Sequence, residues 1–96
     1  MTKLANYIND KNGFIIKLRM YDEFDENDYL NIKNTLIDII PEWKKTGVIS
    51  TDDFSAMIDL IDQLSGGCIY WSEEVSLKVQ EANMELINII HEKLDI

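Results

Sequence analysis

The sequence predicts a small, mainly α protein: one helical bundle of three to five helices spanning residues 1–96. The chain has 96 residues and is 46% hydrophobic, which suits one domain with its own core. Apolar residues recur every three to four positions along three long segments, as on one face of an α-helix. Short connectors that contain Gly or begin with helix-capping residues separate these segments.

The N-terminal segment leaves two structures open. Leu4, Tyr7 and Ile8 have helical spacing, and Thr2 could cap a short helix. Alternatively, residues 4–8 and 14–20 could pair as a β-hairpin around NDKNG, because apolar residues in the second stretch also alternate with a period of two. The helical spacing favours the helix.

The first long helix is predicted over about residues 27–40. Asp25 can cap its N-terminus, and Asp28 places negative charge in its first turn. Pro41 should end or bend it, and Gly47 should stop a final turn formed by PEWKKT. The predicted apolar face comprises Tyr29, Ile32, Leu36, Ile39 and Ile40.

The second long helix is predicted over about residues 51–64, with Ser50 or Thr51 as its cap. Asp52, Ser55, Asp59 and Asp62 follow at spacings of three and four, so they should form one stripe on the outer face. The residues expected to face inward are Phe54, Ile58, Ile61 and Leu64, with Met57 beside them.

The third long helix is predicted from Ser72, its cap, to about Leu94, with Glu73 and Glu74 in the first turn. Glu74 and Lys78 are spaced to pair on its surface. Its predicted buried face comprises Val75, Val79, Ala82, Leu86, Ile89 and Ile90.

The charge balance restricts the partners. Eighteen acids and nine bases give a net charge of −9. This argues against binding nucleic acid or an anionic membrane, because both need Lys and Arg, and it favours a cationic partner. The single cysteine, Cys68, allows no internal disulfide, and there is no signal-like or membrane-spanning apolar run, so a cytoplasmic location is expected.

No catalytic constellation is visible. The one histidine, His91, lies near a predicted helix C-terminus where a cation suits the helix dipole, and Cys68 has no base nearby in sequence. The acidic run DEFDEND fits no EF-hand register, because it lacks the central Gly and correctly spaced oxygens. We therefore expect no enzyme activity, no metal and no cofactor.

A partner-binding face is predicted between Lys45 and Lys78, an interval without Lys or Arg that contains the adjacent rings of Tyr70 and Trp71. Interface hot spots favour such rings with polar groups around them. The predicted partner-binding residues are Asp52, Asp53, Ser55, Asp59, Asp62, Tyr70, Trp71, Glu73 and Glu74.

The order of FDENDYLNIKNTL, STDDFSAMIDLIDQL, SGGCIYW and the helix from Ser72 resembles the immunity proteins of nuclease colicins. In that family the acids of the second helix and a pair of tyrosines bind the toxin. The resemblance therefore implicates Asp52, Asp53, Asp59 and Asp62 together with Tyr70 and Trp71. It also extends to immunity proteins of other systems, such as contact-dependent growth inhibition.

The expected function is thus a monomeric or weakly dimeric, non-enzymatic inhibitor of a basic bacterial toxin. A nuclease is the favoured toxin, because its substrate-binding surface must be basic. Two alternatives stay open. A nucleic-acid mimic that blocks a host defence enzyme would carry acids spaced like phosphates over several helices. An acyl carrier-like protein would carry phosphopantetheine on Ser55, although Phe54 interrupts the Asp-Ser-Leu pattern of such carriers.

Overall fold

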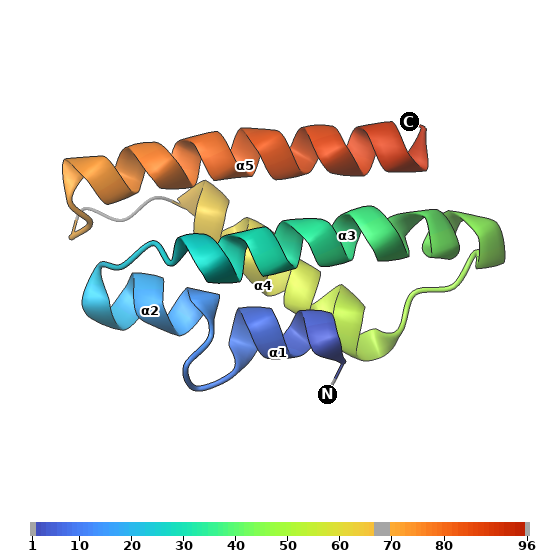
Figure 1. The fold of residues 1–96 in the computed structure, drawn as a ribbon, viewed down its shortest axis with the longest axis horizontal. Coiled ribbons are helices and arrows are strands. Elements are labelled where there is room, and N and C mark those ends of the chain that lie inside the picture. Colours follow the sequence, from blue (N-terminus) through green and yellow to red (C-terminus); the bar gives the residue numbers. More distant parts are fainter. Residues whose placement is uncertain (1, 67–69, 96) are drawn as a thin grey trace.

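Two long helices, α3 (Glu26–Thr46) and α5 (Glu73–Leu94), lie side by side and run in the same direction (Figure 1). Between them in sequence, α4 (Thr51–Gly66) runs back across the molecule, and the short helices α1 (Lys3–Asn9) and α2 (Phe14–Tyr21) complete the bundle. This computed structural model describes residues 2–66 and 70–95. Within those ranges there is no strand, so the mainly helical class is confirmed.

The N-terminal segment is helical, and the alternative β-hairpin is wrong. The Thr2 hydroxyl accepts a hydrogen bond from the Ala5 N–H at 3.2 Å, which caps α1. Along α2 the buried residues are Phe14, Ile15 and Leu18, a helical set that does not match the period of two. The sequence left a helix and a β-hairpin open for this segment, and the residues that the fold buries have helical spacing.

Gly13 makes the tight connection between α1 and α2 possible. A Cβ atom built at this position would lie 2.9 Å from both the backbone nitrogen and the backbone oxygen of Asp10. These backbone atoms cannot move aside as a flexible side chain would. A residue without a side chain is therefore needed where the two helices turn towards each other.

Helix α3 begins as predicted but does not end at Pro41. It continues to Thr46, and Gly47 then caps it in a left-handed conformation with φ of 71°, its N–H bonded to the Trp43 carbonyl. Trp43 packs against the core from the turn beyond the proline. This packing and the Gly47 cap offset the hydrogen bond that Pro41 cannot donate.

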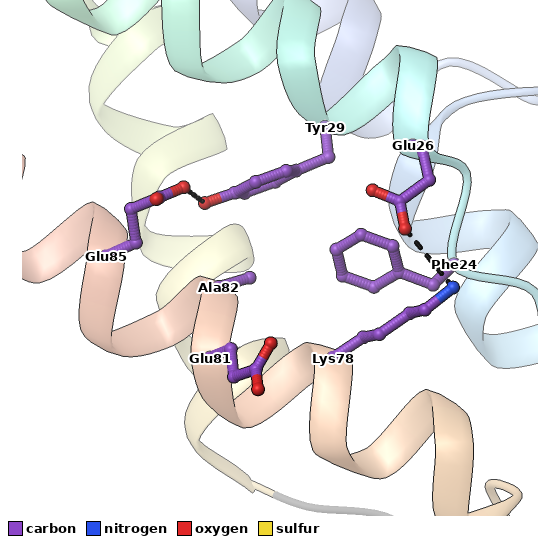
Figure 2. A pocket seen from close by; sticks show the side chains of 7 residues that line it. All are labelled: Phe24, Glu26, Tyr29, Lys78, Glu81, Ala82 and Glu85. Carbon is purple, nitrogen blue, oxygen red and sulfur yellow. Dashed lines mark hydrogen bonds and ion pairs between the residues drawn. The ribbon is translucent and has the colours of Figure 1, made fainter.

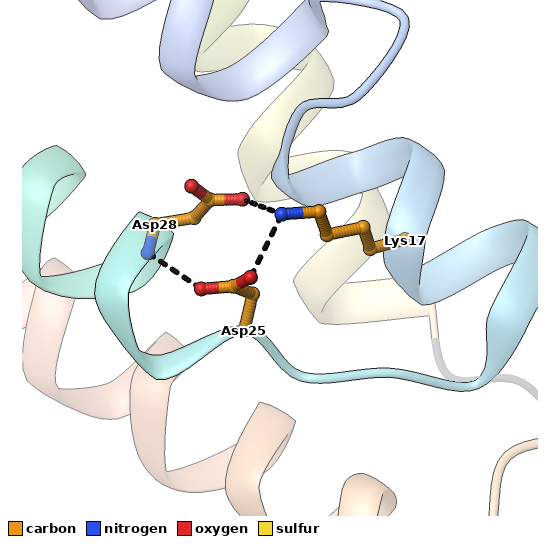
Figure 3. Close-up of polar contacts among 3 residues, drawn as sticks. All are labelled: Lys17, Asp25 and Asp28. Carbon is orange, nitrogen blue, oxygen red and sulfur yellow. Dashed lines mark hydrogen bonds and ion pairs between the residues drawn. The ribbon is translucent and has the colours of Figure 1, made fainter.

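A three-residue polar cluster fixes the start of α3 against α2 (Figure 3). The Lys17 ammonium lies 2.7 Å from the Asp25 carboxylate and 2.9 Å from the Asp28 carboxylate. Asp25 also accepts a hydrogen bond from the Asp28 N–H at 2.9 Å, so the predicted cap is confirmed. The hydrogen bond from Lys17, followed by that from the Asp28 N–H, lowers the pKa of Asp25.

Replacing Asp25 with asparagine should reduce stability by about 0.2–1 kcal/mol near neutral pH, because asparagine retains a cap oxygen but loses the ion pair. The folded-state pKa of Asp25 lies below its ordinary value of 3.8. The stabilisation is therefore present above that value and is lost as the pH falls through the folded-state pKa. Urea unfolding of both proteins across acidic pH should show their difference shrinking towards zero, and a difference that stays constant would contradict the ion pair.

The core lies where the five helices meet. Among its fully buried members are Phe14 from α2, Leu36 from α3, Leu60 from α4 and Val79 from α5. The radius of gyration is 13.1 Å, close to the roughly 12.5 Å expected of one domain of this length. The predicted inward faces of α3 and α5 are confirmed, except that Ile39, Ile89 and Ile90 are only partly buried. The Ser72 cap and the Glu74–Lys78 pair, at 3.5 Å, are also confirmed.

Helix α4 is rotated from its predicted orientation. Its buried residues are Asp53, Ala56, Met57, Leu60 and Leu64. The sequence prediction that Phe54, Ile58 and Ile61 face inward is therefore wrong, because these side chains are 57%, 52% and 36% exposed. The surface that α4 presents to solvent is consequently much more apolar than predicted.

Candidate functional site

The two adjacent rings of the predicted aromatic anchor point to different environments. Tyr70 is 85% exposed, whereas Trp71 is 8% exposed. The Trp71 indole N–H donates to the Leu18 carbonyl at 2.9 Å, so both its ring and its polar group are used within the fold. Trp71 therefore does not present its ring to a partner, and the predicted anchor is corrected to Tyr70 alone.

The connector before α5 is also held by Asp22. Its carboxylate accepts hydrogen bonds from the Ser72 N–H at 2.9 and 3.1 Å. Together with Trp71, this contact docks the start of α5 on the end of α2. Cys68 and its neighbours Gly67 and Ile69 lie outside the described residues.

Asp53 is a second predicted site residue that belongs to the interior. Its side chain is buried at 9% exposure and accepts a hydrogen bond from the Thr2 hydroxyl at 2.6 Å. The Asp53 N–H is bonded in turn to the Ser50 hydroxyl at 3.2 Å, which confirms Ser50 as the cap. Asp53 therefore ties the start of α4 to the start of α1 and is not available to a partner.

The remaining carboxylates of α4 do form an outward stripe, as predicted. Asp52, Asp59 and Asp62 are exposed, and Ser55 lies among them. Asp59 accepts a hydrogen bond from the Asn9 side-chain amide at 3.0 Å. Asp59 and Asp62 also line a polar hollow of about 210 Å³ that includes Arg19 of α2.

The other predicted contacts do not join this stripe. Tyr70, Glu73 and Glu74 lie at the end of the molecule where α5 begins, whereas α4 starts towards the end where α3 finishes (Figure 1). The 16 residues of α4 span roughly 24 Å. One partner would have to follow the whole of α4 to touch both Asp52 and Tyr70.

Sequence reasoning missed an apolar groove beside the acidic stripe. The eight residues that line it come from α3, the connector after it, α4 and α5, and none is polar. They are Trp43, Ile49, Phe54, Met57, Ile58, Ile61, Ile90 and Leu94. We call this surface the apolar groove.

The width of the apolar region of α4 was the signal that could have revealed the groove. Each residue turns a helix by about 100°, so Phe54, Ile58 and Ile61 form one face and Ala56, Leu60 and Leu64 form another. Together they cover about half of the circumference. A helix on the surface of a small bundle buries a narrower stripe than this, so one of the two faces must remain outside.

A third hollow, of about 220 Å³, lies between α3 and α5, and two of the three acids that line it, Glu26 and Glu85, have partners (Figure 2). The Tyr29 hydroxyl donates to Glu85, and Lys78 lies 3.2 Å from Glu26. The hydrogen bond from Tyr29 lowers the pKa of Glu85, while burial, together with Glu85, raises the pKa of Tyr29. These contacts join α3 to α5.

No family model, curated protein or solved structure matches the chain. Among residues 2–66 and 70–95, no group of three or more His, Cys, Asp or Glu could hold a metal ion. No helix in the part of the chain that the structure describes is long and apolar enough to cross a membrane.

Proposed function

We propose that this protein is a non-enzymatic inhibitor that captures a basic protein, specifically a cationic bacterial toxin of the nuclease type. The observation that carries the proposal is the outer surface of α4. There Asp52, Asp59 and Asp62 face solvent, and no Lys or Arg occurs from residue 46 to residue 77. A nuclease must present a basic surface to its phosphate substrate, so it has the charge that complements this helix.

The proposed mechanism is stoichiometric capture. The carboxylates attract the toxin and align its Lys and Arg side chains, which mainly raises the association rate. The apolar groove supplies contacts that become desolvated on binding, and such contacts mainly lower the dissociation rate. The exposed Tyr70 would extend the contact only for a partner that follows α4 along its length.

Immunity proteins are usually encoded beside their toxins, so the direct test uses the candidate nuclease encoded next to this protein. We expect equimolar inhibitor to abolish its nuclease activity, and the two proteins to elute together in gel filtration. The double substitution Asp59→Lys with Asp62→Lys should slow association by at least about tenfold at low salt, with a smaller effect at high salt.

The matched control is Asp38→Lys with Glu92→Lys. Both positions are exposed and lie outside α4, and the double substitution makes the same change in net charge. Equal slowing by the two double variants would show that only net charge matters, which contradicts a site on α4. Nuclease activity that stays undiminished at every ratio of inhibitor to nuclease would contradict the proposed function itself.

A further inference from the structure

The apolar groove leaves several large apolar side chains exposed to solvent. Phe54 and Ile58 are both more than half exposed, and Ile49 in the connector is 43% exposed. Contiguous exposed apolar side chains bordered by polar residues are a common feature of protein-binding surfaces. The hollow has a volume of about 180 Å³, which is below the ~300–1,000 Å³ typical of small-molecule sites. It is therefore suited to anchor side chains of a protein partner.

Charge restricts what can cover the groove. On α4 the exposed apolar face borders the carboxylate stripe directly, since Asp62 follows Ile61 in sequence and lies one turn beyond Ile58. At the ends of α3 and α5, Lys44 already lies 3.7 Å from Asp95. The groove therefore has an acidic flank along α4, and an occupant that is apolar on one side needs cationic residues on the adjoining side.

We infer that the apolar groove binds one amphipathic α-helix of the basic partner, with Lys or Arg along the flank that faces Asp59 and Asp62. This inference rests on the proposed function and specifies how the partner is held. A helix that binds in an apolar groove inserts side chains spaced i, i+3 or i+4, and i+7 into it. The exposed row of Phe54, Ile58 and Ile61 runs along α4 with complementary spacing.

A second copy of this chain is a poorer occupant. Each copy carries a net charge of −9, so pairing through α4 would bring two acidic stripes together. The basic helix instead neutralises the stripe while it covers the apolar side chains. Positive charge on the occupant should therefore strengthen binding to the groove, whereas the negative charge of a second copy should weaken it.

The test uses synthetic peptides and the full-length chain, so it does not depend on the toxin. One peptide is a helix with Leu at i, i+4 and i+7 and Arg on one flank. A second replaces Arg with Glu, and a third replaces Leu with Ser. With isotope-labelled isoleucine methyl groups, we expect the first peptide alone to shift the signals of Ile58, Ile61 and Ile90 while those of the buried Ile32 and Ile40 stay in place.

Substitution Ile58→Lys should weaken binding of the first peptide by at least about 30-fold, as expected of a central anchor position. Ile58 is half exposed, so the variant should remain folded with an unchanged helical circular dichroism signal. The matched control is Leu77→Lys on α5, which removes a side chain of similar size and 57% exposure outside the groove. It should bind the peptide as tightly as the original chain.

Three results with the peptides and the isolated chain would overturn the inference, and a fourth would come from toxin neutralisation. One is equal binding of the Arg and Glu peptides, and another is no loss of binding in Ile58→Lys. The third is a dimer in analytical ultracentrifugation that Ile58→Lys abolishes, because it would identify the groove as a self-interface. If Ile58→Lys still neutralises the toxin while the α4 charge reversal does not, the groove inference fails and the proposed function stands. If the peptides bind as expected but no toxin is neutralised, the proposed function fails instead.

Discussion

Substitution Trp71→Ala should lower the free energy of unfolding by about 3–5 kcal/mol, the largest effect expected of any residue in the predicted aromatic anchor. The indole is buried and its N–H donates to the Leu18 carbonyl. Alanine would leave a cavity between α2 and the start of α5, and it would leave the Leu18 carbonyl without this donor. Urea unfolding followed by circular dichroism measures the loss.

The neighbouring substitution Tyr70→Ala is the matched control, because it also removes a large ring but at a position that is 85% exposed. It should change stability by no more than about 0.5 kcal/mol. Trp71→Phe should give an intermediate loss, since it keeps one buried ring but removes the second ring and the N–H donor. If Trp71→Ala is as stable as Tyr70→Ala, the ring is not part of the core.

Substitution Phe14→Ala should be comparably destabilising, by about 3–5 kcal/mol. The ring is fully buried and packs edge-on against Phe24 at a centroid distance of 5.2 Å. It also lies 6.2 Å from the Tyr29 ring, so it joins α2 to the start of α3. Aromatic pairs of this geometry add to the stabilisation from buried area alone.

Met20→Ala on the same helix separates the two interpretations of α2. A strand with a period of two would place residues 14 and 20 on the same face, whereas the helix leaves Met20 69% exposed. We therefore expect Met20→Ala to alter the free energy of unfolding by at most about 0.5 kcal/mol. Similar losses for both substitutions would contradict the helical structure of residues 14–21.

The starts of the three long helices were the most predictable part of this protein. The caps supplied by Asp25, Ser50 and Ser72 all lie where the sequence placed them. A cap needs only a side-chain oxygen and a backbone N–H three residues later, so the neighbouring sequence carries the whole signal. Gly47 ends α3 as predicted, but the continuation of the helix through Pro41 was less predictable, because it depends on packing of Trp43 against the core.

The candidate site was only partly predictable for the same reason. Outward placement of Asp52, Asp59 and Asp62 followed from their spacing alone. Burial of Asp53 did not, since its hydrogen-bond donor is Thr2, far away in sequence. The apolar groove could not be predicted, because a pattern of apolar residues does not distinguish an exposed isoleucine from a buried one. The groove is also formed by segments that come together only in the folded chain.

By itself, the sequence determined the helical class, the caps and the strongly negative charge, because these depend on residue type and on contacts within one or two turns. Only the tertiary structure decided which side of α4 faces the core and which ring of the Tyr70–Trp71 pair is buried. A helix with apolar residues around half of its circumference can be buried in more than one rotation. The positions of the neighbouring helices select the rotation that fills the core, and the apolar side chains left over form the groove.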